Sequence, residues 1–155
     1  MVSTGSCVGI LPFLDPDTVV LVGQYRYVAG RHTWEMPTGG VAPGEPITDA
    51  AQRELAEESG YRAGRLEPVC VYHTSKSVMD ETAHLFLGFD LTRMEDQPEP
   101  DETESFQMRP HRFEEVLAMV DAGEIVDSMT IIAVLQAERR RAGRWPGGNR
   151  QGQQL

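Results

Sequence analysis

The sequence lacks the signatures of membrane and secreted proteins. Its 155 residues contain no run of about 18 apolar residues, which a membrane-spanning helix requires. The first residues, MVSTGSCVGILPF, lack a basic region followed by a long apolar one, so they do not form a secretory signal. We therefore expect a cytoplasmic protein with no membrane partner.

Cysteine and positive charge are also scarce. The two cysteines, Cys7 and Cys70, occur in apolar, strand-like surroundings without the spacing of metal ligands, so we expect buried free thiols. Lysine and arginine together number 14 against 24 aspartates and glutamates, which gives a formal net charge of −10. Because so acidic a chain repels phosphate groups, nucleic acid is not an expected partner.

Runs of β-branched and apolar residues predict strands. They lie at 6–13, 18–28, 65–74 and 83–92, with a further short strand at 106–111. Segments rich in glycine, proline or charge are expected to be loops, and the longest are 29–46, 75–82 and 95–105. The strands do not alternate regularly with helices, which favours an α+β fold over a βαβ repeat.

Three segments are predicted to be helices, namely 47–60, 112–123 and 127–141. Thr48 or Asp49 is expected near the N-cap of the first, and Gly60 at its C-terminal end. Asp127 or Ser128 is expected to cap the third. The length fits one domain, predicted to span residues 1–142, and the Gly-, Pro- and Gln-containing residues 143–155 are expected to be a disordered tail.

The first helix collects glutamates in the stretch RELAEESG, residues 53–60. At 100° per residue, Glu54, Glu57 and Glu58 occupy an arc of about 100°. Glu54 and Glu58 lie above apolar residues of the preceding turns, so the acids share the side that should face the interior. Arg53, the one cation within the helix, is expected nearer to Glu57 than to Glu54 and cannot neutralise three acids.

Carboxylates crowded in this way indicate a cation site. They repel one another and are costly to bury unless they are paired or bound to a metal. A hard divalent cation that takes oxygen ligands, Mg²⁺ or Mn²⁺, suits them. The alternative is a solvated charged face, which would place the acids opposite the apolar stripe. Gly39 and Gly40, in the preceding PTGGVAPGE, let the backbone approach a ligand or metal closely.

The spacing of these residues resembles a known motif. Gly39 is followed by five residues, Glu45, seven residues and then RELAEESGY. This resembles the complete Nudix box, G-x5-E-x7-R-E-U-x-E-E-x-G-U, where U is bulky and apolar. The last U position is occupied here by the aromatic Tyr61. The resemblance implies a Nudix-type α/β/α sandwich with a central mixed β-sheet and the Nudix loop and helix.

The Nudix resemblance also implies an activity and its residues. Nudix proteins are mostly Mg²⁺-dependent hydrolases that cleave a nucleoside diphosphate linked to another group, by attack of water on a phosphorus. The implied metal ligands are Glu54, Glu58, Glu57 and the backbone carbonyl of Thr38. The structural residues of the box are Gly39, Glu45, Arg53 and Gly60, of which Glu45 and Arg53 are implied to pair and tie the loop to the helix.

Flanking residues resemble the ADP-ribose and ADP-sugar pyrophosphatase branch of that family. VVLVGQYRYVAGRHTWEMPTGG is similar to its QYR…E-x-P-A-G segment, which implies that Arg26 contacts phosphate or the terminal ribose and Glu35 a sugar hydroxyl. An exposed strand arginine is the alternative for Arg26.

The general base in that branch is a glutamate on the loop before the last strand. This implies Glu104 or Glu102, and Glu104 is favoured because the apolar Phe106 should start the strand two residues later. A carboxylate of the box, Glu57, is a further catalytic candidate. The alternative for the loop glutamates is a solvated acidic loop.

The sequence departs from that branch in two places. Its S-P-G turn is replaced by YHTSKSVMDE, where Lys76 is a candidate phosphate contact and Asp80 or Glu81 a candidate sugar or metal contact. Only 38 residues precede Gly39, so the N-terminal β-domain that builds a swapped dimer in the branch is expected to be missing. A homodimer is still an expectation, without a defined mode.

The resemblance therefore implies Mg²⁺-dependent hydrolysis of ADP-ribose or an ADP-sugar to AMP and a sugar phosphate. Two alternatives stay open. One is a nucleoside-triphosphate pyrophosphohydrolase of the same fold, and the other is a non-catalytic Nudix domain that senses a ligand. The expected partner in all three cases is a small nucleotide.

Overall fold

The computed structural model describes residues 2–28, 30–95 and 107–143. Its elements follow one another along the chain as β1 (Val2–Asp15), β2 (Thr18–Arg26), β3 (Arg31–Glu35), β4 (Thr38–Gly40), α1 (Ile47–Ser59), β5 (Tyr61–His73), β6 (Met79–Arg93), β7 (Gln107–Arg112), α2 (Phe113–Asp121) and α3 (Ser128–Arg141). No helix of the described residues is long and apolar enough to cross a membrane.

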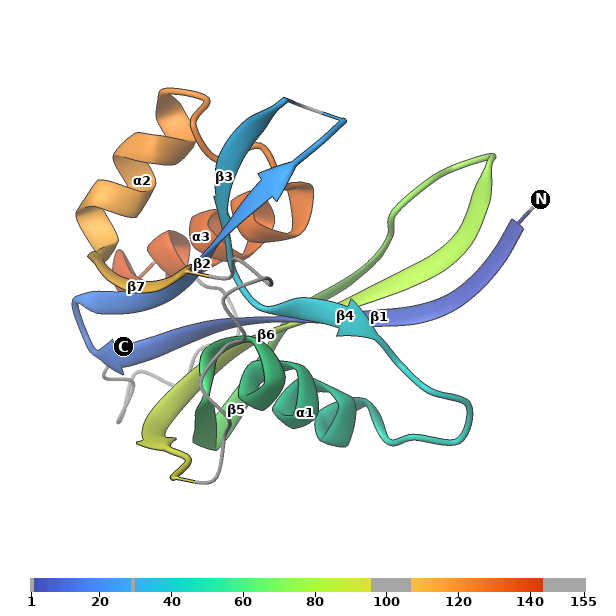
Figure 1. Cartoon of the computed structure of the whole chain (residues 1–155), viewed down its shortest axis with the longest axis horizontal. Coiled ribbons are helices and arrows are strands. Elements are labelled where there is room, and N and C mark those ends of the chain that lie inside the picture. Colours follow the sequence, from blue (N-terminus) through green and yellow to red (C-terminus); the bar gives the residue numbers. More distant parts are fainter. Residues whose placement is uncertain (1, 29, 96–106, 144–155) are drawn as a thin grey trace.

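The long strand β1 organises the sheet (Figure 1). It pairs with β6 in parallel, with β4 in antiparallel fashion through Val8 and Gly39, and through its last residues with β2. The strands β3 and β7 pair antiparallel with the two edges of β2, and β5 pairs antiparallel with β6. The mixed sheet confirms the predicted α+β fold.

Helices cover the two faces of the sheet because the strands alternate apolar residues toward both. Val8 and Ile10 of β1 belong to the core that α1 buries, whereas Leu11 and Phe13 belong to the core under α2 and α3. In Figure 1, α1 lies below β1, and α2 and α3 lie above it. The outcome is the predicted α/β/α layering, with α1 packed against the end of β4.

Two strands lie within residues 29–46, where we predicted only a loop. β3 and β4 occupy that segment, and the prediction is wrong for them. β3 contains Thr33 and Trp34, residue types that favour strands, and pairs along the edge of β2. β4 is glycine-rich and is held by pairing with β1. β6 likewise begins at Met79, inside a predicted loop.

The helix ends lie close to where the sequence predicts them. Gly60 ends α1 in the left-handed conformation with φ of 75°, and its amide donates to the Ala56 carbonyl. The Asp127 side chain caps α3 by accepting from the Thr130 amide, and α2 ends before Gly123. The N-cap of α1 is Pro46, two residues before Thr48, which with Asp49 was expected near this cap, and proline offers no side-chain acceptor.

The two cysteines are both free, as predicted. Cys7 is buried, whereas Cys70 is only half-buried, so the prediction of burial is wrong for the second. Burial raises the pKa of the Cys7 thiol to about 11. This thiol is therefore protonated at neutral pH and serves as an apolar core residue.

Candidate active site

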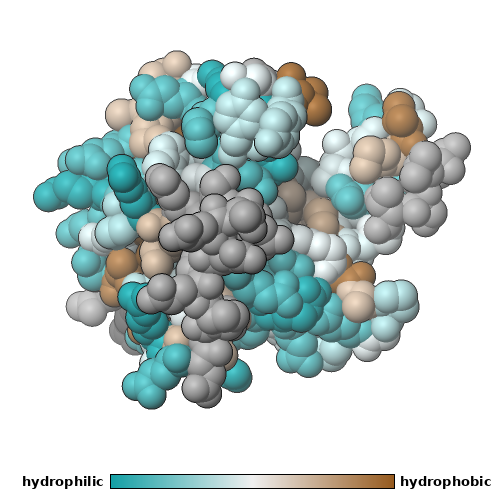
Figure 2. Space-filling view, viewed as in Figure 1, coloured by the Kyte–Doolittle hydropathy of each residue, from teal (hydrophilic) through white to brown (hydrophobic). Residues whose placement is uncertain are grey.

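The glutamates of α1 lie at different depths. Glu54 is buried, with 9% of its surface exposed, and Glu58 is half-buried. The Glu57 side chain is 58% exposed. Figure 2, which has the viewpoint of Figure 1, shows a mostly hydrophilic surface in the region of α1. The prediction that all three glutamates face the interior is therefore wrong for Glu57. Their arc of about 100° is wider than the strip of the helix surface that the sheet covers.

The carboxylate of Glu54 rests on the backbone of Gly39. A Cβ atom added to Gly39 would lie 2.0 Å from the Glu54 Cδ atom and 2.2 Å from its Oε1. Only glycine leaves this space open, and the pairing of β4 with Val8 holds Gly39 in place. Burial raises the pKa of Glu54, and the hydrogen bond from Arg53 opposes that shift.

Glu58 faces the start of β4. Its Oε2 accepts a hydrogen bond from the Thr38 amide at 3.2 Å. Burial, with the charges of Glu54 and Glu35 nearby, raises the pKa of Glu58 to about 7, although the Thr38 amide and Arg26 favour its ionised form. The carboxylates here thus exceed the positive charge available to neutralise them.

Arg53 joins the loop before α1 to the helix. Its Nε and Nη2 donate to the two oxygens of Glu45 at 2.9 and 3.0 Å, and Nη2 also donates to the Gly40 carbonyl. Its Nη1 lies 2.7 Å from Glu54 Oε1 and 3.5 Å from Glu57 Oε2. Our expectation that Arg53 lies nearer to Glu57 is wrong, because the two-point contact with Glu45 holds the guanidinium on the inner side of the helix.

The Glu45 contact predicts a pH-dependent stability. Hydrogen bonds from Arg53 and from the Ala42 amide lower the pKa of Glu45 from the ordinary 4.5 to about 2. The unfolded state takes up a proton first on acidification, so this contribution is complete above pH 4.5 and is lost as the pH falls toward 2. We expect Glu45→Gln to unfold at a lower temperature than the wild type at pH 7, with a gap that closes toward pH 2 in circular-dichroism melts.

The exposed Glu115→Gln on α2 is the matched control for Glu45→Gln. It should leave the wild-type pH profile unchanged. A gap between Glu45→Gln and the wild type that stays constant from pH 7 to 2 would contradict the ionic contribution.

A cavity of about 200 Å³ opens beside Glu58. It is lined by Val22, Gln24, Arg26, Glu35, Met36, Thr38 and Glu58. Arg26 donates to both oxygens of Glu35, from Nε at 2.8 Å and from Nη2 at 2.5 Å, and the Thr33 hydroxyl donates to Glu35 at 2.9 Å. The Glu35 side chain is 8% exposed and that of Arg26 is 46% exposed. Arg26 therefore keeps part of its guanidinium open to the cavity.

Residues 4–145 match the model of the NUDIX domain family. The chain belongs to the Nudix family. It is 32% identical over 135 residues to an ADP-ribose pyrophosphatase of Bacillus subtilis (strain 168), covering 87% of this chain and 73% of the relative. It is 30% identical over 135 residues to a methanol dehydrogenase activator of Bacillus methanolicus, with the same coverage.

A solved structure shares the Nudix fold. The crystal structure of an ADP compounds hydrolase matches with a TM-score of 0.77 at 22% identity, covering 90% of this chain and 75% of that one. The Nudix resemblance inferred from the box is thereby confirmed. The family and the pyrophosphatase relative make this Nudix chain a pyrophosphatase, a hydrolase of phosphorus-containing anhydrides.

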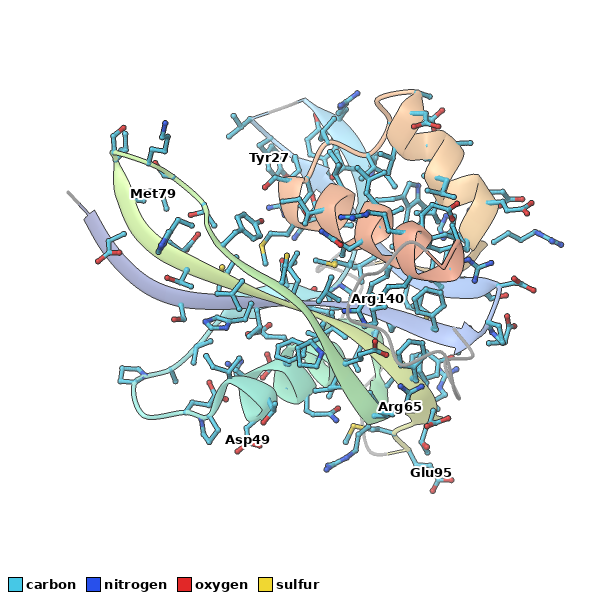
Figure 3. All side chains as sticks on the ribbon, turned by 180° about the vertical axis from the view of Figure 1, so that it is seen from behind. Tyr27, Asp49, Arg65, Met79, Glu95 and Arg140 are labelled. Atoms are coloured by element: carbon cyan, nitrogen blue, oxygen red, sulfur yellow. The ribbon has the colours of Figure 1, made fainter. Side chains whose placement is uncertain are left out.

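The Nudix site combines some of the predicted residues and not others. Glu58, Thr38, Glu35 and Arg26 line one cavity, and Glu54 lies beside it on Gly39. Lys76 does not line the cavity. It lies in the connection between β5 and β6, three residues before Met79. Figure 3 labels Met79 at the tip of the β5–β6 arm, the hairpin that these two strands form. The predicted bases Glu102 and Glu104 lie outside the described residues and stay predictions.

The donors of the Nudix site fit a hard cation, although they do not form a complete cage. Within the described residues, no group of three or more His, Cys, Asp or Glu side chains stands close enough to hold a metal ion. Glu58 lines the cavity and Glu54 lies beside it on Gly39, and burial raises the pKa of both carboxylates. Mg²⁺ usually takes one or two carboxylates and completes its shell with water and substrate phosphate, so this donor set suits it.

Two site residues were missed by the sequence reasoning. Gln24 lines the cavity, and Thr33 holds Glu35 in its orientation. The period-2 alternation of a strand places Val22, Gln24 and Arg26 on one side, so this signal identifies Gln24 once Arg26 is suspected. The same alternation places Thr33 on the side of Glu35, two residues further along β3, but only once that segment is known to be a strand.

Proposed function

We propose that this Nudix protein hydrolyses ADP-ribose or a closely related ADP-sugar to AMP and a sugar phosphate, with Mg²⁺. The observation that carries the proposal is the Arg26–Glu35 pair in a cavity that also contains Glu58 and Thr38. A guanidinium binds phosphate and a carboxylate accepts from sugar hydroxyls, so the pair suits a sugar phosphate. The Bacillus subtilis relative named ADP-ribose pyrophosphatase supports the same substrate class.

The cavity is too small to enclose the whole proposed substrate. Sites that enclose a drug-sized ligand measure roughly 300–1,000 Å³. The cavity here is about 200 Å³, which holds one end of a dinucleotide-sized substrate. We assign it to the sugar phosphate, with the scissile pyrophosphate toward Glu58.

The proposed roles follow from the side-chain positions. Glu54, Glu58 and the Thr38 carbonyl would hold the cation, with Glu57 as a further ligand through water. When bound, Mg²⁺ neutralises phosphate charge and lowers the pKa of a coordinated water. Attack forms a bond from water oxygen to phosphorus and breaks the bridging P–O bond, and a carboxylate of the chain takes the proton. Glu104 or Glu102 is the base that we propose, and Arg26 orients the substrate.

A substrate panel tests the proposal. ADP-ribose, ADP-glucose and the four dNTPs are each incubated with Mg²⁺, with Mn²⁺ or with EDTA, and the products are separated by ion-exchange chromatography. We expect an ADP-sugar to show a kcat/KM at least about tenfold above any dNTP, with AMP as product and no turnover in EDTA. Glu58→Gln protein, purified in parallel, is the control, because any hydrolysis that it shows measures contaminating phosphatase. Hydrolysis of dNTPs alone would overturn the substrate assignment.

Several expectations stay predictions beside this one. They are the cytoplasmic location, the homodimer, Mn²⁺ as a substitute metal, the single domain over residues 1–142, and the absence of nucleic-acid binding. The predicted disordered tail lies outside the described residues from position 144 onward.

A further inference from the structure

The turn between β3 and β4 carries two groups of the site. Glu35 ends β3 and Thr38 begins β4, so only Met36 and Pro37 separate the cavity carboxylate from the amide that binds Glu58. Pro37 has no N–H to donate and restricts Met36 to extended backbone. The position of the turn therefore depends on hydrogen bonds from other elements.

Two such bonds clamp the turn from distant parts of the chain. The Ile10 amide of β1 donates to the Pro37 carbonyl at 3.0 Å. The Met36 amide donates to the Thr130 hydroxyl of α3 at 3.1 Å, across 94 residues of sequence. Met36 and Thr130 are 1% and 0% exposed, so water cannot replace the hydroxyl.

The hydroxyl is itself oriented by the N-cap of α3. Thr130 Oγ1 donates to Asp127 Oδ2 at 2.6 Å, and the Thr130 amide donates to the same oxygen at 2.9 Å. A hydroxyl can accept and donate at once. One chain of hydrogen bonds thus runs from the Met36 amide through Thr130 to a carboxylate, whose charge strengthens it.

Packing around Gly9 keeps these groups in contact. A Cβ atom added to Gly9 would lie 2.5 Å from the Met36 Cε atom and 3.0 Å from that of Met129. The two methionines therefore fill the space above Gly9 on β1. They hold the first turn of α3 and the β3–β4 turn against the same strand, so a displaced Thr130 would move Met36 with it.

We propose that Thr130 is a positioning residue of the active site, whose hydroxyl places the β3–β4 turn and so sets Glu35 and Thr38 relative to Glu58. Asp127 orients that hydroxyl. The inference rests on the proposed function in one respect only, which is the choice of the substrate whose turnover is measured. The competing explanation is that Thr130 merely stabilises α3.

Three variants separate positioning from stability. Thr130→Val keeps the shape and removes the hydroxyl, and Thr130→Ser keeps the hydroxyl. Val134→Ala removes the two γ-methyl groups of a fully buried side chain on the same helix, outside this hydrogen-bond chain. We expect Thr130→Val to lower kcat by about 10–100-fold with KM changed less than about threefold. Thr130→Ser and Val134→Ala should keep kcat within about threefold, although Val134→Ala melts at a lower temperature.

Hydrogen exchange of the Met36 amide gives a readout that needs no substrate. We expect Thr130→Val to exchange this amide at least about tenfold faster than the wild type at matched stability, and Thr130→Ser to resemble the wild type. If the wild type turns over no ADP-sugar, the proposed function fails. The role of Thr130 is then still tested by the exchange rate of the Met36 amide and by the kcat for whichever nucleotide is hydrolysed.

Asp127→Asn covers the case in which Thr130→Val does not fold. It keeps an N-cap acceptor and makes it neutral, so kcat should fall in the same direction by about threefold or more while the melting temperature stays close to that of the wild type. A folded Thr130→Val protein with wild-type kcat overturns the inference, as does a Val134→Ala protein that loses as much kcat, or an unchanged kcat in Asp127→Asn.

Discussion

Glu58→Gln is expected to abolish hydrolysis and, at the same time, to make the metal-free protein more stable above pH 7. The side chain lines the cavity and is one of two carboxylates that we assign to the cation. Its neutral replacement keeps the shape and an acceptor for the Thr38 amide but loses the charge. We expect kcat/KM to fall by at least about 10³-fold, as for loss of a group that stabilises the transition state through a metal.

The gain in stability follows from the sign of the pKa shift. Burial raises the pKa of Glu58 to about 7, above its ordinary value of 4.5. Between these values the folded state binds more protons than the unfolded state, so the free energy of unfolding falls as pH rises. Above pH 7 the ionised side chain costs about 1–3 kcal/mol, which Glu58→Gln removes. Below pH 4.5 the difference vanishes.

Thermal melts in EDTA and in Mg²⁺, from pH 4 to pH 9, measure this effect beside the kinetics. Added Mg²⁺ should raise the melting temperature of the wild type and leave Glu58→Gln unchanged. Asp49→Asn is the matched control, because Asp49 lies exposed in the first turn of the same helix (Figure 3). Activity within tenfold of the wild type in Glu58→Gln would rule out the metal assignment, and equal melting in EDTA at pH 8 would rule out the buried charge.

Gly39→Ala is expected to have the second-largest effect. The added methyl would overlap the Glu54 carboxylate, whose Cδ atom lies 2.0 Å from the new Cβ position. The carboxylate must move, or β4 must separate from α1. We expect a loss of about 10²-fold in kcat/KM and an increase of about tenfold in the Mg²⁺ concentration for half-maximal activity.

The adjacent glycine provides the control. A Cβ atom at Gly40 would meet nothing within 4 Å, and its φ is not positive. Gly40→Ala should therefore keep wild-type kinetics and the same Mg²⁺ dependence. Steady-state kinetics over a Mg²⁺ titration compares the two variants. Equal losses in both would show that Gly39 acts through backbone freedom and not through the space that it leaves for Glu54.

The box and its helix could be predicted from the sequence because both depend on neighbours along the chain. Glycine at position 60 ends α1 by a local hydrogen bond, and the spacing from Gly39 to Glu58 identifies the family. The depth of each glutamate was harder to predict. A helical wheel separates Glu54 from Glu57 by 60°, and only the edge of the sheet decides that the first is buried and the second exposed.

Features that depend on distant pairing could not be predicted. β3 and β4 form inside a segment rich in glycine and proline because β2 and β1 offer unpaired edges there. Lys76 was a candidate only because its segment replaces the S-P-G turn of the related branch. Nothing in the sequence of that segment shows where the β5–β6 arm points. Thr130 carries no motif, and its contact with Met36 spans 94 residues. Such contacts are properties of the assembled fold.

Contacts between distant parts of the chain have a consequence for its synthesis. Val8 of β1 pairs with His84 of β6, and the Met36 amide in the β3–β4 turn finds its acceptor only in Thr130 of α3. A ribosome adds about 5–20 residues per second, so α1 emerges several seconds before Thr130. During that interval the glutamates of α1 meet solvent and dissolved cations without the surroundings that later raise the pKa of Glu58. We expect nucleotide hydrolysis to appear on nascent chains only after α3 has left the exit tunnel.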